Sequence, residues 1–210
     1  MDIAEQPVGR RARNKQRVRD RLYSSALEVI LEKGYDHASV DEIAERADVA
    51  RGTFFNYFPR KEDLIGAWAE QRRESIRAAV GDTAPADCPS AQSQLAQYMR
   101  ALGRINDTEE DLTVAMLTAW VRAGRPLFED PHLAKLFEAV VENGQKSGEF
   151  SRNVSAERVS YALRDLYLGA LYEWARSSPV SRHPPLEHRL QEILTLLVGG
   201  IAAAPARPEE

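Results

Sequence analysis

The stretch ADVARGTFFNYFPRKEDL, residues 47–64, decides the fold of this chain. It gathers four aromatic residues into five positions before Pro59: Phe54, Phe55, Tyr57 and Phe58. Phe54 and Phe58 are one helical turn apart, so they can share one buried face. Polar side chains fall on the other faces of the same short helix: Arg51, Thr53 and Asn56. The pattern therefore predicts an aromatic platform that holds polar residues outward.

The residues before this stretch predict two further helices. Apolar residues recur at helical spacing up to Gly34, a typical C-terminal stop. Ser39 and Glu42 form a capping box, in which each side chain satisfies a backbone N–H that the helix leaves free. The expected helices cover residues 16–33, 40–47 and 51–57. A short turn at Asp48 joins the last two, which is the arrangement of a helix-turn-helix whose second helix enters the DNA major groove.

The rest of the chain also has a helical pattern, and nothing shows a strand-like alternation long enough to build a sheet. We expect a break between two of these helices at Asn106–Asp107. The expected helices cover residues 61–80, 90–104, 109–123, 131–147, 155–177 and 186–203. The fold class is therefore all-α, with 210 residues available to bury a sizeable core.

The chain resembles the tetracycline-repressor (TetR) family of bacterial transcriptional regulators. SVDEIAERADVARGTFFNYFPRKEDLI, residues 39–65, carries the resemblance, with ALEVILEKGYDHA, residues 26–38, before it. The resemblance implies an N-terminal three-helix helix-turn-helix domain and a C-terminal helical domain for ligand binding and dimerisation. The expected segments are a flexible basic arm, the DNA-binding domain, the ligand-binding and dimerisation domain and a flexible tail, at residues 1–15, 16–60, 61–204 and 205–210.

Three positions depart from the family pattern. Asp48 stands where the family often has glycine, and an aspartate tolerates the left-handed turn. Ala50 replaces a common serine or threonine cap, which costs about 1 kcal/mol of local capping. Phe55 replaces a frequent tyrosine, so a hydroxyl that contacts phosphate is missing. These changes affect DNA affinity more than the fold.

The resemblance also implies roles for individual residues. Contacts with the DNA backbone are assigned to Ser39, Tyr57 and Lys61. Base readers are Arg51, Thr53 and Asn56, because arginine pairs with guanine, asparagine with adenine, and the threonine methyl packs on thymine. A structural role competes at each of the three, and packing competes at Tyr57.

The N-terminal arm is strongly basic although the chain as a whole has a net charge of −4. Residues 10–21 hold seven basic residues and one acidic residue. Arg11 and Arg13 in this segment could follow phosphates or enter the minor groove. A solvated tail is the alternative.

The last two expected helices carry apolar residues on too many faces for a monomer surface. We expect a homodimer built on residues 155–177 and 186–203, and the alternative is a pair of central core helices in a monomer. The resemblance implies a small-molecule pocket in the C-terminal domain. We assign it to Tyr98, Met116 and Trp120, although ordinary core is the alternative for each, and expect a neutral or hydrophobic effector.

Enzyme motifs are missing, and no cofactor or metal is expected. The four histidines do not form a ligand cluster, and Cys88 is either a bystander thiol or a redox sensor. No apolar run is long enough for a membrane helix. We therefore expect a cytoplasmic, dimeric regulator, a repressor that binds a pseudo-palindromic operator and is released by a small, largely apolar ligand. The alternative is a helical dimeric interaction protein that kept the scaffold without reading DNA.

Overall fold

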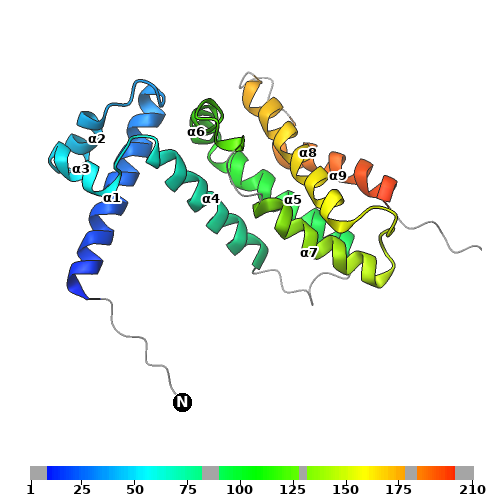
Figure 1. Cartoon of the computed structure of the whole chain (residues 1–210). Coiled ribbons are helices and arrows are strands. Elements are labelled where there is room, and N and C mark those ends of the chain that lie inside the picture. Colours follow the sequence, from blue (N-terminus) through cyan, green and yellow to red (C-terminus); the bar gives the residue numbers. More distant parts are fainter. Residues whose placement is uncertain (1–8, 82–89, 128–131, 178–183, 202–210) are drawn as a thin grey trace, which may run out of the picture. The chain divides into compact units, whose positions relative to one another are not determined.

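The structure, a computed structural model, describes four stretches of the chain: residues 9–81, 90–127, 132–177 and 184–201 (Figure 1). In these stretches every regular element is a helix, as the sequence predicted. The helices are α1 (Arg10–Lys33), α2 (Val40–Arg46), α3 (Arg51–Tyr57), α4 (Asp63–Gly81), α5 (Ala91–Thr108), α6 (Glu110–Arg122), η2 (Arg125–Leu127), α7 (His132–Ser147), α8 (Ala156–Arg176) and α9 (Leu186–Ile201).

The chain divides into two compact units. The first unit is formed by two segments, the residues up to Ala69 and Ala115–Arg125. The second unit is formed by Glu70–Val114 and the residues from Pro126 onward. This division differs from the boundary that we expected after residue 60. The start of α4 belongs to the first unit because Leu64 and Ile65 are almost fully buried. The expected tail at residues 205–210 and the first eight residues lie outside the described part of the chain.

The first unit is built on a core that α1, α2, α3 and the start of α4 share. Its fully buried apolar side chains include Leu22, Ala26, Ile30, Ile43, Phe54 and Leu64. Burying one such large side chain stabilises the fold by about 1.5–3 kcal/mol. Phe58 packs against Phe54 with ring centroids 5.6 Å apart, which confirms the expected aromatic platform. This core fixes α3 from its inner side.

Helix α1 begins at Arg10, earlier than the expected start near residue 16. Residues 10–15, which we assigned to a flexible arm, are therefore the first turns of a helix. Residues 10–17 are exposed, and this end of α1 extends beyond α2 and α3 (Figure 1). The sequence pattern did not predict these turns because they have no apolar face, although arginine, alanine, lysine and glutamine are good helix formers. Gly34 ends α1 with φ of 78°, as expected.

The turn between α2 and α3 has the predicted local geometry. Ser39 caps α2, and its hydroxyl and the Glu42 carboxylate form the complete capping box. Asp48 has φ of 51°, so this aspartate adopts the left-handed conformation that glycine often supplies. Ala50 stands at the N-cap of α3 without a capping side chain. The backbone therefore turns sharply enough to place α3 across α2.

The second unit packs α5 against α9 and α7 against α8 (Figure 1). Glycines allow the closest approaches. A Cβ added at Gly103 in α5 would lie 2.4 Å from the Cα of Glu187 in α9. A Cβ added at Gly144 in α7 would lie 2.4 Å from the ring of Phe150. These two glycines are required by packing.

Carboxylates from neighbouring elements cap two helices of the second unit. Glu149 accepts hydrogen bonds of 2.8 Å from the first two N–H groups of α5. Asp107 accepts bonds of 3.1 Å from the N–H groups of Leu186 and Glu187, which begin α9. Both carboxylates therefore satisfy backbone donors that the helices themselves leave free.

The expected break at Asn106–Asp107 was wrong, because α5 continues to Thr108. The side chain of Asn106 is buried and donates to the Leu102 carbonyl at 2.7 Å and the Tyr167 hydroxyl at 3.1 Å. Asp107 is used for the cap of α9. Apart from the bond to Leu102 within α5, these bonds are tertiary, and they hold both side chains within a continuous helix instead of at the break that asparagine and aspartate often cause.

Candidate nucleic-acid interface

The outer face of α3 is a small polar surface on the rigid core of the first unit. Its exposed residues are Arg51, Gly52, Phe55 and Asn56. The opposite face carries Phe54, which is fully buried. No atom lies within 4 Å of a Cβ added at Gly52, so another molecule can approach the backbone there. This arrangement, one buried aromatic face and one open polar face, is what a groove-reading helix requires.

Arg51 is held in place by two neighbours. Its guanidinium forms an ion pair with Asp41 of α2 and lies 5.7 Å from the ring centroid of Phe55. The Arg51 side chain is 59% exposed and that of Asp41 63% exposed. An exposed pair of this kind is worth at most about 1 kcal/mol. Guanine can therefore displace Asp41 at small cost.

Phe55 is a candidate that the sequence analysis treated only as a lost tyrosine. Its side chain is 39% exposed on the open face of α3 and meets Phe54 edge to face at 5.5 Å. An exposed aromatic ring there can pack on a thymine methyl group. The sequence already indicated that Phe55 lies beside Arg51, because residues four apart share one side of a helix.

The structure separates the three expected base readers. Arg51 and Asn56 are exposed on the open face, whereas Thr53 is half-buried. The Thr53 backbone N–H donates to the carbonyl of Ala50 at 2.8 Å, within the first turn. Tyr57, an expected backbone contact, is also half-buried. Thr53 and Tyr57 thus combine a packing role with partial access to the surface.

Ser39, expected to bind phosphate, is already engaged in the cap of α2. Its hydroxyl accepts from the Glu42 N–H at 3.2 Å and donates to the Glu42 carboxylate at 3.0 Å. Lys33 also donates to this carboxylate. The Lys33 ammonium and the Ser39 donors together lower the pKa of Glu42 from 4.5 to about 2. The local charge next to Ser39 is thus a paired carboxylate.

This pairing predicts a pH dependence of stability. The lowered pKa of Glu42 means that its stabilising contribution is complete above about 4.5 and is lost as the pH falls towards about 2. We expect Glu42→Gln to unfold at a lower urea concentration than wild type at neutral pH. The difference between the two proteins should shrink as the solution is acidified. Glu45→Gln, an exposed change on the same helix, is the control.

Unfolding series of wild type and of both variants at successive pH values measure this difference. If wild type and both variants lose stability in parallel as the pH is lowered, the pH dependence does not arise from Glu42.

We expected Lys61 at the N-terminus of α4, but the structure does not place it there, because α4 begins at Asp63. Its ammonium donates to the Tyr35 carbonyl and lies 4.4 Å from the centroid of the Tyr35 ring. Partial burial lowers the pKa of Lys61. Because an ammonium has three donors, the bond to Tyr35 leaves others for a phosphate. The phosphate contact of Lys61 stays a prediction.

The basic residues of α1 fall into two groups. Arg19 and Arg21 are tied to the helix-turn-helix: Arg19 lies 5.4 Å from the centroid of the Phe58 ring, and Arg21 donates to the Asp48 carbonyl at 3.4 Å. Arg11 and Arg13 are exposed on the first turns of the helix. The proposed DNA contacts of these two residues therefore start from a helix, not from a flexible arm.

The three residues expected to line a ligand pocket are not brought together in one unit. Tyr98 belongs to the second unit, where it is buried with its ring 6.5 Å from that of Phe137. Met116 and Trp120 belong to the first unit, with Met116 fully buried. Their role in binding a ligand stays a prediction.

No group of three or more histidine, cysteine, aspartate or glutamate residues in the described stretches is placed to hold a metal ion. The described histidines are exposed: His37, His132 and His188. Cys88 lies outside the described residues. Among the helices described, none has the length and apolar character to cross a membrane.

Comparisons with known proteins agree with this geometry. Residues 22–68, which contain the helix-turn-helix, match the model of the family "Bacterial regulatory proteins, tetR family". The chain is 28% identical over 193 residues to the transcriptional repressor KstR of Mycolicibacterium smegmatis, covering 90% of this chain and 92% of KstR. It is 36% identical over 101 residues to the transcriptional regulator TcmR of Streptomyces glaucescens, covering 48% of this chain but only 44% of TcmR.

A solved structure extends the likeness to the whole fold. The TetR family transcriptional repressor FadR of Thermus thermophilus, in complex with lauroyl-CoA, superposes with a TM-score of 0.72 at 28% identity. The superposition covers 91% of this chain and all of that FadR chain. The fold and the exposed face of α3 define a helix-turn-helix transcriptional regulator. The chain belongs to the tetR family of bacterial regulatory proteins.

Proposed function

We propose that the chain is a cytoplasmic, dimeric repressor that binds a pseudo-palindromic DNA operator and is released by a small, largely apolar ligand. The observation that supports it best is the outer face of α3. There Arg51 and Asn56 are exposed on a helix whose other face is locked into the core by Phe54. A rigid support of this kind can hold side chains that hydrogen-bond with base edges.

The dimer would form through α8 and α9. Leu196 of α9 is 79% exposed and Leu166 of α8 is 39% exposed, so both side chains are accessible to a partner helix. Three glycines on these helices have no atom within 4 Å of an added Cβ: Gly169, Gly199 and Gly200. Leucines beside open glycines let a second helix approach closely. A two-fold dimer would then present two copies of α3 to operator half-sites about one DNA turn, or a multiple of it, apart.

The effector would bind in the second unit, and one solved neighbour supports its class. FadR of Thermus thermophilus is a repressor seen with lauroyl-CoA, a ligand with a long apolar part. The second unit of this chain holds many apolar side chains around a few polar ones, the composition of small-molecule sites. The polar ones include Asn106 and Tyr167, which bond to each other at 3.1 Å.

The experiment that tests the proposal is selection of DNA from a random pool by the purified protein, at near-physiological salt. We expect enrichment of one inverted repeat, which also supplies a probe for effectors that release the protein. The competing hypothesis is a helical dimeric interaction protein that no longer reads DNA. A folded, dimeric protein that enriches no sequence, with or without added ligands, would favour that hypothesis.

A variant of Arg51 tests direct reading of a base. We expect Arg51→Ala to lower discrimination at one operator position by about 1–3 kcal/mol, because a bidentate contact with guanine is lost. Binding to sequences that already differ at that position should change little. Parallel selections with wild type and variant measure this as a loss of preference at a single base pair.

Arg46→Ala is the matched control, since it removes the same charge from the neighbouring helix α2. The Arg46 guanidinium bonds with Glu32 at 2.6 and 2.8 Å. We expect the control to leave the preferred sequence unchanged. If both variants relax the same position, Arg51 does not read a base.

A further inference from the structure

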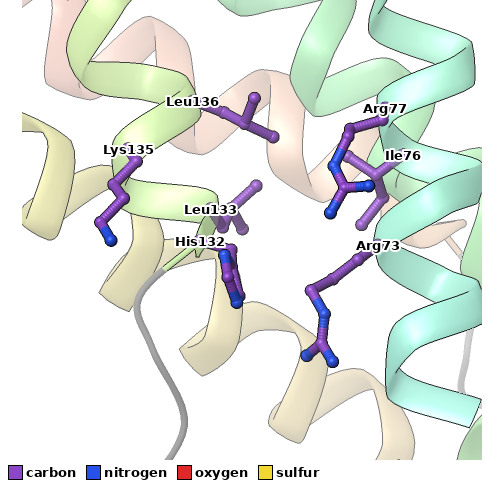
Figure 2. Close-up of a pocket in the computed structure, with 7 residues that line it drawn as sticks. All are labelled: Arg73, Ile76, Arg77, His132, Leu133, Lys135 and Leu136. Carbon is purple, nitrogen blue, oxygen red and sulfur yellow. The ribbon is translucent and has the colours of Figure 1, made fainter. Parts of the chain in front are cut away.

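A groove lies between the second half of α4 and the first turns of α7, both within the second unit (Figure 2). It has a volume of about 240 Å³. Residues from the two helices line it: Arg73, Ile76, Arg77, His132, Leu133, Lys135 and Leu136. No ligand-binding role was predicted for these residues from the sequence.

The groove combines an apolar surface with cationic groups. Its three apolar side chains are half-buried: Ile76, Leu133 and Leu136. The guanidinium groups of Arg73 and Arg77 and the ring of His132 are directed towards the space between the two helices (Figure 2). The Arg77 side chain is 56% exposed and that of Arg73 is 23% exposed. A binding molecule would therefore meet positive charge and apolar surface together.

One carboxylate pairs with both arginines. Glu70 lies 2.6 Å from Nη2 of Arg73 and 3.7 Å from Nη2 of Arg77. The short contact commits Glu70 to Arg73, and the longer one leaves Arg77 weakly compensated. Lys135 adds a further positive charge to the lining. Among the described lining residues, Arg77 and Lys135 thus carry positive charge that Glu70 offsets only weakly, which favours an anion.

We propose that this groove binds the anionic head group of an amphipathic small molecule, a carboxylate or a phosphate ester with an aliphatic tail. Arg77 would bind the head group, because a guanidinium offers paired donors that match carboxylate and phosphate oxygens. The carbons next to the head group would lie on Ile76, Leu133 and Leu136. The volume of about 240 Å³ is below the ~300–1,000 Å³ typical of complete small-molecule sites, so the groove holds only part of the ligand.

Binding of an amphiphile in the groove does not depend on the proposed function. Only the role of this amphiphile as the effector rests on that function. We expected a neutral or hydrophobic effector because few charged residues lie within the apolar stretches of the sequence. The groove arises where charged residues of two helices far apart in the chain meet around an apolar surface. It therefore adds an anionic end to an otherwise apolar ligand.

Titration calorimetry on the wild-type protein gives the first test. The probes are decyl phosphate, decanoate, decanol and inorganic phosphate, all below micelle-forming concentrations. We expect decyl phosphate and decanoate to bind at least about tenfold more tightly than decanol and than inorganic phosphate, because a bidentate, charge-assisted hydrogen bond to a guanidinium is stronger than a simple exposed ion pair. The two anionic probes distinguish a phosphate from a carboxylate head group. Equal affinity for decanol and both anionic amphiphiles would overturn the proposal.

Charge reversal locates the binding site. Arg77→Glu should weaken binding of the preferred anionic probe by about tenfold or more while leaving decanol binding unchanged. Lys146→Glu makes the same change in charge further along α7, where Lys146 pairs with Glu142, and should leave both unchanged. Circular dichroism checks that each variant is folded, and Arg77→Ala is the milder second variant. Equal losses in the arginine and lysine variants would show that only the overall charge matters, and would reject the groove.

DNA binding is measured separately, so that the two proposals fail in different ways. We expect the preferred amphiphile to release wild-type protein from its selected operator, and Arg77→Glu to need more amphiphile for release while binding DNA normally. Amphiphile binding without release would keep the groove site and reject its effector role. Weaker operator binding by Arg77→Glu, with unchanged amphiphile affinity, would instead assign the groove to DNA and overturn the proposal.

Discussion

Gly103→Ala is expected to destabilise the protein by roughly 3 kcal/mol, an overpacking effect at the upper end of the usual range. The new Cβ would lie 2.4 Å from the Cα and 2.6 Å from the backbone N of Glu187. Carbon atoms pack best at about 3.5–4.0 Å, so α5 and α9 would have to separate by on the order of 1 Å. That movement would also pull the first N–H groups of α9 away from the Asp107 carboxylate.

Urea and thermal unfolding at one fixed protein concentration measure the effect. For a chain of this size, a loss of roughly 3 kcal/mol lowers the melting temperature by about 6–12 °C. Gly66→Ala in α4 is the matched control, because its Cβ would lie 3.9 Å from the nearest atom, Nη2 of Arg125. Alanine should stabilise that helix by up to about 1 kcal/mol. If both variants were equally stable, the close contact of α5 with α9 would be refuted.

The sequence predicted most helices because their signals are local. Gly34, the Ser39 capping box and Pro59 act within one or two turns, and the structure has the expected element boundary at each. The break at Asn106–Asp107 failed for a non-local reason. Asn106 bonds to Tyr167 and Asp107 caps α9, and no feature of the local sequence reports partners so far along the chain.

The sequence predicted the candidate DNA interface to a similar extent as the helices. The exposure of Asn56 follows from its position almost opposite the buried Phe54, since helical spacing fixes which residues share a face. Arg51 lies on a face next to that of Phe54 and is exposed at the first position of α3. The bond of Lys61 with Tyr35 did not follow, because it depends on how the loop before α2 lies against the start of α4. The α4–α7 groove was beyond sequence reasoning for the same reason, since its charged residues meet only after the chain folds.

Leu196→Glu is expected to convert the protein from a dimer to a folded monomer and to weaken operator binding by roughly 10²–10⁴-fold. The Leu196 side chain is 79% exposed in the single chain, so a glutamate there removes little from its core. In a two-fold interface through α9, each glutamate would instead be buried beside its copy, and like charges would face each other without a partner. The loss is large because a monomer binds only one half-site. In a dimer, binding of the first α3 places the second α3 at a high effective concentration near the other half-site, and a monomer lacks this effect.

Sedimentation gives the oligomeric state, circular dichroism the fold, and titration of the selected operator the affinity. Val154→Glu is the matched control, because Val154 is 44% exposed in the same unit but lies outside α8 and α9. We expect this control to remain dimeric and to bind the operator as wild type does. A Leu196→Glu protein that stays dimeric would place the interface elsewhere. A monomeric variant with undiminished operator affinity would show that one copy of α3 is enough for operator binding. Only loss of the dimer together with loss of affinity, in the α9 variant alone, supports an operator read by two copies of α3 joined through α8 and α9.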